Sequence, residues 1–351
     1  MEMRSFSKRI LFSGGYGFIG NHYVRHLVRN YPDWLIVNLD ALTYAGVKEN
    51  LEDVEGEKNY RFEYGDVSDF DFVNSVFERY DITDVIHLAA SSHVDRSLSA
   101  PMEFLKSNTV GTVTLLEVAR NHWSKKEDFK DHKFYYFSTD EVFGFLDNDG
   151  KPFTEENKIQ PSSPYSASKA AGDLFVKAYH TTYGMSTLIS HCSNAIGPAQ
   201  MLEKLIPATI QRILNNEPII VYDQGLQVRE WIYTDDIVSA AMCVFEKGVP
   251  GEAYNIGSGN ECRNIDLINM IIAEICRLKP EEYGHKTFKF NFVENARPGH
   301  DFRYAINNSK VINNLGWEGP KNDIKDCVKK TVQWYLNNQE WVKNIKKRNE
   351  K

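Results

Sequence analysis

Short apolar runs alternate with stretches of helical periodicity over the first 190 residues of this chain. The runs are rich in β-branched and aromatic residues and are bounded by polar residues or glycine, which is typical of buried strands. Strands are predicted on this basis at residues 9–13, 35–39, 61–65, 84–90, 133–138 and 187–189. Three helical patterns are predicted: one begins at residue 18, one spans residues 108–120, and one begins near Pro164. This alternation predicts an α/β fold with a doubly wound parallel sheet, in which right-handed crossovers bring both candidate sites to one edge.

The pattern changes beyond residue 190, where a loop rich in polar residues, Gly and Pro follows. Thr234, Asp235 and Asp236 form an N-cap signal for one of the later helices. The tail at residues 341–351 is basic and at best amphipathic, so we expect a solvated helix end there. The other elements predicted in this half are helices at 205–214, 237–246 and 264–278, and strands at 218–222, 229–233 and 253–256.

Glycines follow the first predicted strand and open the first helix. Gly14, Gly17 and Gly20 allow a tight turn, close approach of the backbone to a pyrophosphate, and close packing of helix on strand. The helix N-terminus adds free N–H groups that favour phosphate. Asp40 ends the second strand about 20 residues later, where an acid binds the ribose of NAD and disfavours the 2′-phosphate of NADP. The alternative is a strand–turn–helix without a nucleotide, but the complete arrangement favours NAD.

Two groups of potentially catalytic residues lie on either side of a polar loop. Tyr165 and Lys169 are four residues apart at a helix start and so share one face. A neighbouring cation, such as Lys169 or an oxidised nicotinamide, lowers the pKa of a tyrosine from about 10 and favours the phenolate. The phenolate then takes a proton from an alcohol as hydride leaves. Thr139, Asp140 and Glu141 follow a strand at the edge where ligands gather. Each pattern alone also occurs on exposed surfaces, but together they predict a reaction site.

Composition narrows the class of protein. A net charge of −7 over 351 residues implies no broad basic surface, which argues against a nucleic-acid partner. Hydrophobic residues make up 42% of the chain, enough for a sizeable core, yet no apolar run is long enough to span a membrane. The N-terminal apolar run is too short for a signal peptide. The five cysteines show no metal-ligand spacing, so we expect no metal and reduced thiols in a cytoplasmic protein.

The motifs together resemble a known family. GGYGFIG at residues 14–20 and the Tyr165/Lys169 pair are similar to the extended short-chain dehydrogenase/reductases, which have a Rossmann sheet and a smaller C-terminal α/β substrate-binding domain. More narrowly, HLAASSHVDRS, FSTDEVFG, PYSASKAAGD, EKLIP, YNIG and RPGHDFRYA resemble the dTDP-glucose 4,6-dehydratases. The resemblance runs from the first glycine loop to about Trp317. Its specific part is the Asp140–Glu141 pair, since relatives that only epimerise lack two acids there.

The resemblance implies that an oxidation by NAD⁺ is coupled to loss of water. Tyr165, beside Lys169, would deprotonate the sugar 4-hydroxyl as hydride leaves C4, and Thr139 would hydrogen-bond the 4-oxygen. Glu141 would remove the C5 proton, and Asp140 would protonate the 6-hydroxyl as water leaves. Hydride returns to C6, so the cofactor ends where it began and stays bound. The implied product is dTDP-4-keto-6-deoxyglucose.

The resemblance also implies which residues contact each ligand. His93 is included, although a polar residue satisfied at a strand end is its structural alternative. Arg229 and Arg297 make physical sense as diphosphate clamps. Cofactor contacts are expected from Gly14, Tyr16, Gly17, Phe18, Ile19, Gly20, Asp40, Thr43, Asp66, Val67, Leu88, Ala89, Ala90, Ser92, Ser107, Tyr165 and Lys169. Nucleotide-sugar contacts are expected from Ser92, His93, Thr139, Asn194, Lys204, Leu205, Tyr222, Arg229, Asn264, Arg297 and His300.

Residues 1–190 are assigned to the NAD-binding domain, to which the chain returns near 229–257. Residues 191–228 and 258–351 are assigned to the nucleotide-sugar-binding domain. A homodimer is expected, because dimers through a helix face are usual for similar proteins.

The chain departs from the family pattern at several positions. Ser91 stands where the family often has glutamate, Ala195 and Ile196 replace the usual Asn and Tyr, Phe143 replaces a Tyr, and Phe302 stands where a basic residue is often found. The nucleobase, thymine or uracil, and the C2 substituent of the sugar stay open. The alternatives are a UDP-sugar 4,6-dehydratase and a nucleotide-sugar 4-epimerase or decarboxylase of the same fold. A non-enzymatic NAD-binding protein would have no need of the intact tyrosine, lysine and acid positions.

Overall fold

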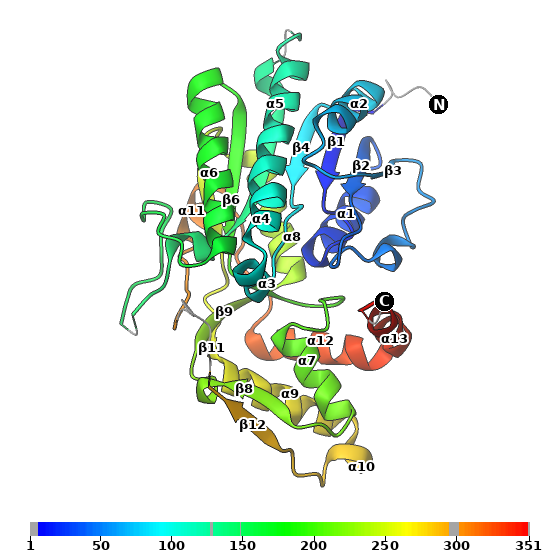
Figure 1. Ribbon diagram of the computed structural model, residues 1–351, viewed down its shortest axis with the longest axis vertical. Helices are drawn as coiled ribbons and strands as arrows, with labels where there is room; N and C mark the ends of the chain where they lie inside the picture. The colour runs from blue at the N-terminus through cyan, green and yellow to red at the C-terminus, as the bar shows by residue number, and fades with distance from the viewer. Residues whose placement is uncertain (1–5, 127–128, 148, 295–301, 350–351) are drawn as a thin grey trace.

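The computed structural model describes residues 6–126, 129–147, 149–294 and 302–349. Its larger part is built on seven strands: β1 (Lys8–Ser13), β2 (Trp34–Asp40), β3 (Tyr60–Tyr64), β4 (Asp84–His87), β5 (Lys133–Thr139), β6 (Ser186–Cys192) and β10 (Ala253–Ile256). They form one parallel sheet in the order β10-β6-β5-β4-β1-β2-β3 (Figure 1). The order reverses beside β1, so the predicted doubly wound sheet is confirmed.

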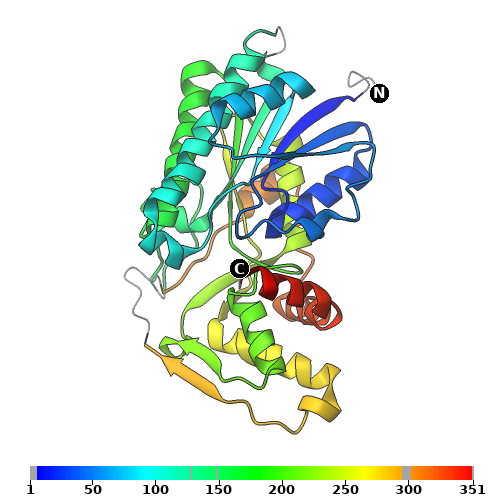
Figure 2. The same cartoon turned by 45° about the vertical axis from the view of Figure 1, so that its right-hand side comes forward.

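Helices cover both faces of this sheet. Successive strand residues point to opposite faces, so Ile10 and Phe12 face one helical layer, whereas Leu11 faces the other. Helices α1 and α8 pack on the first face, and α2, α5 and α6 pack on the second (Figure 2). Their bounds are α1 (Phe18–Asn30), α2 (Phe70–Tyr80), α5 (Gly111–Trp123), α6 (Pro164–Tyr183) and α8 (Thr234–Lys247), with the short α3 (Val94–Ser99) and α4 (Pro101–Phe104) before α5.

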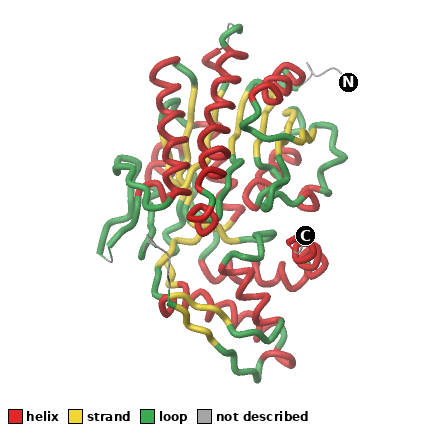
Figure 3. Tube along the Cα trace, viewed as in Figure 1, coloured by secondary structure: helices red, strands yellow, loops and turns green. Residues whose placement is uncertain are grey.

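The smaller part combines two short sheets with helices (Figure 3). A three-stranded sheet has the order β11-β9-β7, and β12 pairs with β8 in parallel. The helix α11 belongs with the larger part, because it contacts α8 and β10. The bounds are β7 (Asn194–Ile196), β8 (Ile219–Tyr222), β9 (Val228–Tyr233), β11 (Glu261–Arg263), β12 (Phe290–Val293), α7 (Leu205–Leu214), α9 (Asn264–Leu278), α10 (Pro280–Tyr283), α11 (Ser309–Leu315), α12 (Ile324–Asn337) and α13 (Gln339–Asn349).

The starts of two predicted helices differ from the structure. Residue 108, from which one helix is predicted, lies inside a continuous helical segment in which the π-helix η3 (Leu105–Val110) runs directly into α5. The predicted N-cap residue Thr234 is already the first residue of α8, which begins directly after β9 and has no side-chain cap. The carboxylate of Asp236 instead accepts hydrogen bonds from the backbone N–H groups of Lys321, at 2.9 Å, and Asn322, at 3.3 Å. A tertiary contact has therefore taken the place of the expected cap.

The expectation of a solvated tail is also wrong. In α13, Val342 and Ile345 are each only 2% exposed. The indole N–H of Trp341 donates to the side chain of Asn50 at 2.9 Å. The apolar face of this basic helix is thus packed against the body of the protein. No helix in the described part of the chain is long and apolar enough to cross a membrane.

Candidate active site

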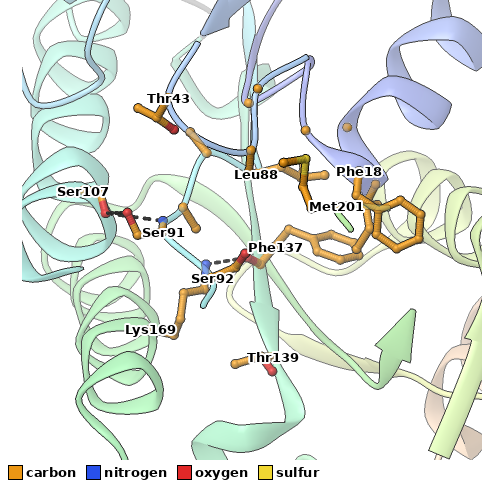
Figure 4. A pocket seen from close by; sticks show the side chains of 18 of the residues that line it. Phe18, Thr43, Leu88, Ser91, Ser92, Ser107, Phe137, Thr139, Lys169 and Met201 are labelled. Carbon is orange, nitrogen blue, oxygen red and sulfur yellow. Dashed lines mark hydrogen bonds between the residues drawn. The ribbon is translucent and has the colours of Figure 1, made fainter. Parts of the chain in front are cut away.

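A pocket opens at the C-terminal edge of the large sheet, where ligands bind in doubly wound folds. Its wall combines ends of strands, starts of helices, and loops (Figure 4). Strands β4 and β5 and the residues after them supply Leu88, Ser91, Ser92, Phe137 and Thr139, helices supply Phe18, Ser107 and Lys169, and loops supply Thr43 and Met201.

The glycine turn lies at one end of this pocket, and its shape requires glycine. Gly14 has a positive φ of 81°, and a Cβ there would lie 2.7 Å from the backbone of Ala89. A Cβ on Gly20 would lie 2.1 Å from the carbonyl oxygen of Gly14. Gly17 caps α1 without any side-chain acceptor, which leaves helix N–H groups for a phosphate. The turn therefore fits a dinucleotide pyrophosphate.

Asp40 lies at the end of β2 and lines the same pocket. Its carboxylate accepts the N–H of Tyr16 at 3.0 Å and that of Leu42 at 2.8 Å. Burial raises the pKa of Asp40, while these two hydrogen bonds and the charge of Arg348 lower it. Each oxygen keeps one lone pair for a ribose hydroxyl. An acid at this position disfavours a 2′-phosphate, so the site fits NAD better than NADP.

The other predicted cofactor residues line this pocket, with one exception. The side chain of Tyr16 is fully buried, and its hydroxyl donates to Glu55 at 2.9 Å. The ring of Tyr16 packs edge-on against Phe62, so only its backbone is turned toward Asp40. Those that line the pocket are Gly14, Gly17, Phe18, Ile19, Gly20, Asp40, Thr43, Asp66, Val67, Leu88, Ala89, Ala90, Ser92, Ser107, Tyr165 and Lys169.

The five predicted catalytic residues also meet in this pocket. Thr139 is the last residue of β5, and the 3-10 turn η5 (Asp140–Phe143) follows it directly. A reciprocal capping box fixes the start of α6: Ser163 accepts from the N–H of Ser166, whose hydroxyl accepts from the N–H of Ser163. The first turns of α6 therefore place Tyr165 and Lys169 beside the end of β5.

The expected lowering of the Tyr165 pKa is not seen in the protein alone. Burial raises the pKa of this phenol well above its usual range, and the charges of Glu141 and Asp140 raise it further. A hydrogen bond with Thr139 acts in the opposite direction. Helical spacing predicted the neighbouring lysine, but not the burial of the phenol or the effect of the nearby carboxyl groups on its pKa.

Lys169 is only 3% exposed and points toward the end of β5. Its ammonium donates to the carbonyl of Phe137 at 2.8 Å and lies 4.2 Å from the ring centroid of Tyr136. Burial lowers the pKa of Lys169 to about 8, and the charge of Asp173 opposes that shift. Asp173 lies one turn further along α6 and is hydrogen-bonded to His191 at 3.1 Å. Lys169 is thus mostly charged at neutral pH.

Asp140 has the properties of a proton donor. It is 2% exposed, and burial raises its pKa well above the usual range, with Glu141 and Glu230 adding to the shift. Thr139 donates to its Oδ1 at 3.3 Å, while its Oδ2 is buried without a hydrogen-bond partner among the described residues. A buried carboxyl with a raised pKa beside a second acid is the arrangement used for paired acid and base roles.

The predicted nucleotide-sugar residues divide into three groups. Ser92, Thr139, Asn194 and Lys204 line the pocket. Arg297 and His300 lie outside the described residues. The others lie outside the pocket wall: His93, Leu205, Tyr222, Arg229 and Asn264.

His93 and Arg229, both outside the wall, have structural contacts. His93 caps α3 by accepting the N–H of Arg96 at 3.4 Å, which matches its structural alternative. Arg229 donates to the carbonyls of Val228 and Phe302, and its guanidinium lies 4.6 Å from the ring centroid of Tyr304.

Asn108 is a residue of this region that no sequence motif indicated. It lies in η3, is 1% exposed, and donates to the carbonyl of Ser91 at 3.0 Å and to Ser168 at 2.9 Å. It therefore ties the loop after β4 to α6. Ser91, which departs from the family pattern, is held in the same group by the hydroxyl of Ser107 at 3.0 Å. The signal for Asn108 is its place in the π-helix, a feature common at functional sites but not visible in sequence periodicity.

Comparison with known proteins places this site in a family. The sequence model of the GDP-mannose 4,6 dehydratase family matches residues 11–331. The chain is 43% identical to the dTDP-glucose 4,6-dehydratase of Salmonella typhimurium, over 96% of this chain and 95% of that one. The chain belongs to the dTDP-glucose 4,6-dehydratase family.

Solved structures of this dehydratase family agree with the fold. The dTDP-glucose 4,6-dehydratase of Bacillus anthracis, in complex with NAD, is 36% identical and superposes with a TM-score of 0.86, over 97% of this chain and 100% of that one. The Streptomyces venezuelae dTDP-glucose 4,6-dehydratase, also with NAD bound, is 36% identical with a TM-score of 0.86, over 95% and 98%. The similarity thus spans both parts of this dehydratase-family chain.

Proposed function

We propose that the protein is an NAD-dependent nucleotide-sugar 4,6-dehydratase that converts dTDP-glucose to dTDP-4-keto-6-deoxyglucose. The observation that carries this proposal is the Asp140–Glu141 pair, which shares one pocket with Tyr165 and Lys169. The family relationship adds the reaction and its substrate, since the relatives named above are dTDP-glucose 4,6-dehydratases.

The first half of the reaction is an oxidation at C4 of the sugar. Tyr165 takes the proton of the 4-hydroxyl, and the hydroxyl of Thr139 turns from Asp140 to donate its hydrogen bond to the 4-oxygen. The buried ammonium of Lys169, which donates a hydrogen bond to the carbonyl of Phe137, supplies positive charge that favours the phenolate form of Tyr165 before it takes this proton. NAD, when bound by the glycine turn and Asp40, supplies the hydride acceptor and later the hydride donor.

The second half removes water across C5 and C6. The 4-ketone acidifies the C5 proton, which Glu141 removes as a base. Asp140 donates its proton to the 6-hydroxyl, so that the C6–O bond breaks and water leaves. The proton held by Glu141 returns to C5, which restores this base, while bound NAD would supply the hydride for C6. Passage of the proton taken by Tyr165 to Asp140 would restore these two residues. The raised pKa of Asp140 supports its assignment as the acid.

A 4-epimerase of the same fold is the second candidate. It needs the tyrosine, the lysine and NAD, but it removes no C5 proton and expels no water. Two acids at the end of β5, one of them buried with a raised pKa, serve no purpose in that reaction. The dehydratase is therefore favoured.

The experiment that tests this function is incubation with a panel of nucleotide sugars, followed by mass analysis of the products. We expect dTDP-glucose to lose the mass of one water without any added oxidant. UDP-glucose, UDP-N-acetylglucosamine and GDP-mannose test the nucleobase and the C2 substituent. An isomer of unchanged mass would support the epimerase instead, and no conversion of any nucleotide sugar would contradict the proposal.

The division of the ligands between the two parts follows from the same proposal. We assign the dinucleotide to residues 1–190 with the return near 229–257, and the nucleotide sugar to residues 191–228 and 258–351, except that β9 belongs to the smaller part and α11 to the larger one. We place the protein in the cytoplasm, because that compartment contains NAD and keeps thiols reduced. Cell fractionation would test this assignment. The five cysteines are free, as this requires.

We also propose that two copies associate through the face formed by α4, η3 and α6. This face exposes large apolar side chains, and such a patch on a monomer marks an interaction site. Sedimentation velocity is expected to give the mass of a dimer, and a monomer at micromolar concentration would contradict it. The exposed residues are Met102, Leu105, Val110, Leu174 and Phe175.

A further inference from the structure

The helix α13 lies at the junction between the two parts of the protein, below α1 in Figure 1. Its buried Ile345 forms one apolar cluster with Val47 and Met201, and the partly buried Trp341 packs against that cluster. Val47 follows the loop after β2, whereas Met201 belongs to the loop before α7 and lines the pocket. The helix therefore contacts both the loop after β2 and the loop before α7. These two loops are far apart in the sequence, and both lie at the pocket.

Arg348, near the end of α13, binds the loop after β2 directly. Its guanidinium donates to the carbonyl oxygens of Leu42, at 3.2 Å, and of Thr43 and Gly46. The planar fork of an arginine is suited to several acceptors at once, whereas a lysine is a single point donor. One side chain thus holds three backbone carbonyls of a five-residue loop, 42–46.

That loop is part of the cofactor pocket. Thr43, Gly46 and the residues between them line it, immediately after Asp40. The loop also has an unfavourable backbone, because Leu42 has a positive φ of 47°. Its N–H nevertheless has to point at the carboxylate of Asp40, to which it donates at 2.8 Å. A conformation of this kind persists only where surrounding contacts hold it.

We propose that Arg348 is a positioning residue for the dinucleotide: by holding the loop 42–46 it keeps Asp40 and the loop in the form that binds the ribose. The helix α13 thereby makes cofactor retention depend on a residue about 300 positions further along the chain. The proposal rests on the assignment of NAD as cofactor. The positive charge of Arg348 also acts on Asp40, whose pKa it lowers.

The direct test is the affinity for NAD⁺ of the Arg348→Ala protein from which bound nucleotide has been removed (the stripped protein), measured by calorimetry. We expect NAD⁺ to bind roughly tenfold more weakly, because part of the binding energy is then used to order the loop. Arg348→Lys keeps the charge but not the forked guanidinium, so its affinity for NAD⁺ is expected to lie between those of the unaltered protein and Arg348→Ala. The matched control is Lys347→Ala, which removes an exposed charge from the neighbouring position and should bind NAD⁺ as the unaltered protein does.

Hydrogen exchange separates positioning from a general loss of stability. In the stripped Arg348→Ala protein, the amides of residues 42–47 should exchange faster, while those of β1 and β6 keep their protection. Binding of dTDP alone should be unchanged, since the proposal concerns only the dinucleotide. Wild-type affinity for NAD⁺ in Arg348→Ala, or an equal loss of NAD⁺ and dTDP binding, would overturn the proposal. If unaltered protein bound no NAD⁺, the proposed function itself would fail.

Discussion

Tyr165→Phe is expected to reduce turnover by about 10² to 10⁴-fold, the usual contribution of a general base. The substitution removes only the hydroxyl that takes the 4-hydroxyl proton, and the ring keeps its edge-on contact with Phe104. The loss should fall on the first hydride step. In a single turnover with bound NAD⁺ and substrate, the transient absorbance of NADH should therefore appear more slowly by the same factor.

The control for this substitution lies on the same helix. Tyr183→Phe, at the exposed end of α6, removes the same hydroxyl far from the pocket and should leave turnover unchanged. NADH formation at the unaltered rate in Tyr165→Phe would remove Tyr165 from the role of base.

Substitution of either acid should reduce overall turnover by about 10² to 10⁴-fold, but the two substitutions should block different steps. Glu141→Gln removes the base at C5, so the 4-keto sugar and NADH should accumulate without loss of water. In heavy water this variant should incorporate no deuterium at C5. Asp140→Asn removes the proton donor for the 6-hydroxyl, so the C5 proton should still exchange with solvent while water is lost slowly.

Glu156→Gln, in an exposed position of the loop between the two catalytic groups, serves as the matched control and should turn over normally. Full dehydration by Glu141→Gln would show that another group removes the C5 proton. Deuterium at C5 in Glu141→Gln and none in Asp140→Asn would reverse the two assignments.

The elements that were predicted correctly are those whose patterns are local. The helices at 205–214 and 264–278 have the predicted bounds because each has a strong apolar period. The strand at 253–256 also has the predicted bounds, because it is a short buried run between Glu252 and Gly257. The parallel sheet followed from the alternation of strands and helices, which leaves few possible topologies. The residues of the glycine turn and of the Tyr165/Lys169 pair were found because their chemistry requires fixed spacings.

The features that the sequence did not reveal depend on contacts between distant residues. In α13, Val342 and Ile345 are two apolar residues in a basic helix, and their burial is decided by distant partners. Ile345 packs with Val47, and Val342 belongs to the apolar core of the smaller part. The direction of the Tyr165 pKa shift depends on enclosure by several elements, which helical spacing does not describe. Thr234 is a residue type that often caps helices, but α8 begins at Thr234 itself because it follows directly on the end of β9.

The most direct test of the mechanism follows the hydride itself, with dTDP-glucose deuterated at C4 and the unaltered protein. If the cofactor is reduced and reoxidised within one turnover, the deuterium must move from C4 to C6 of the same sugar. We therefore expect a product that has lost one water and carries deuterium at C6. Deuterium retained at C4, as in an epimerase, or released as free deuterated NADH, as in a simple dehydrogenase, would contradict the proposed dehydratase mechanism.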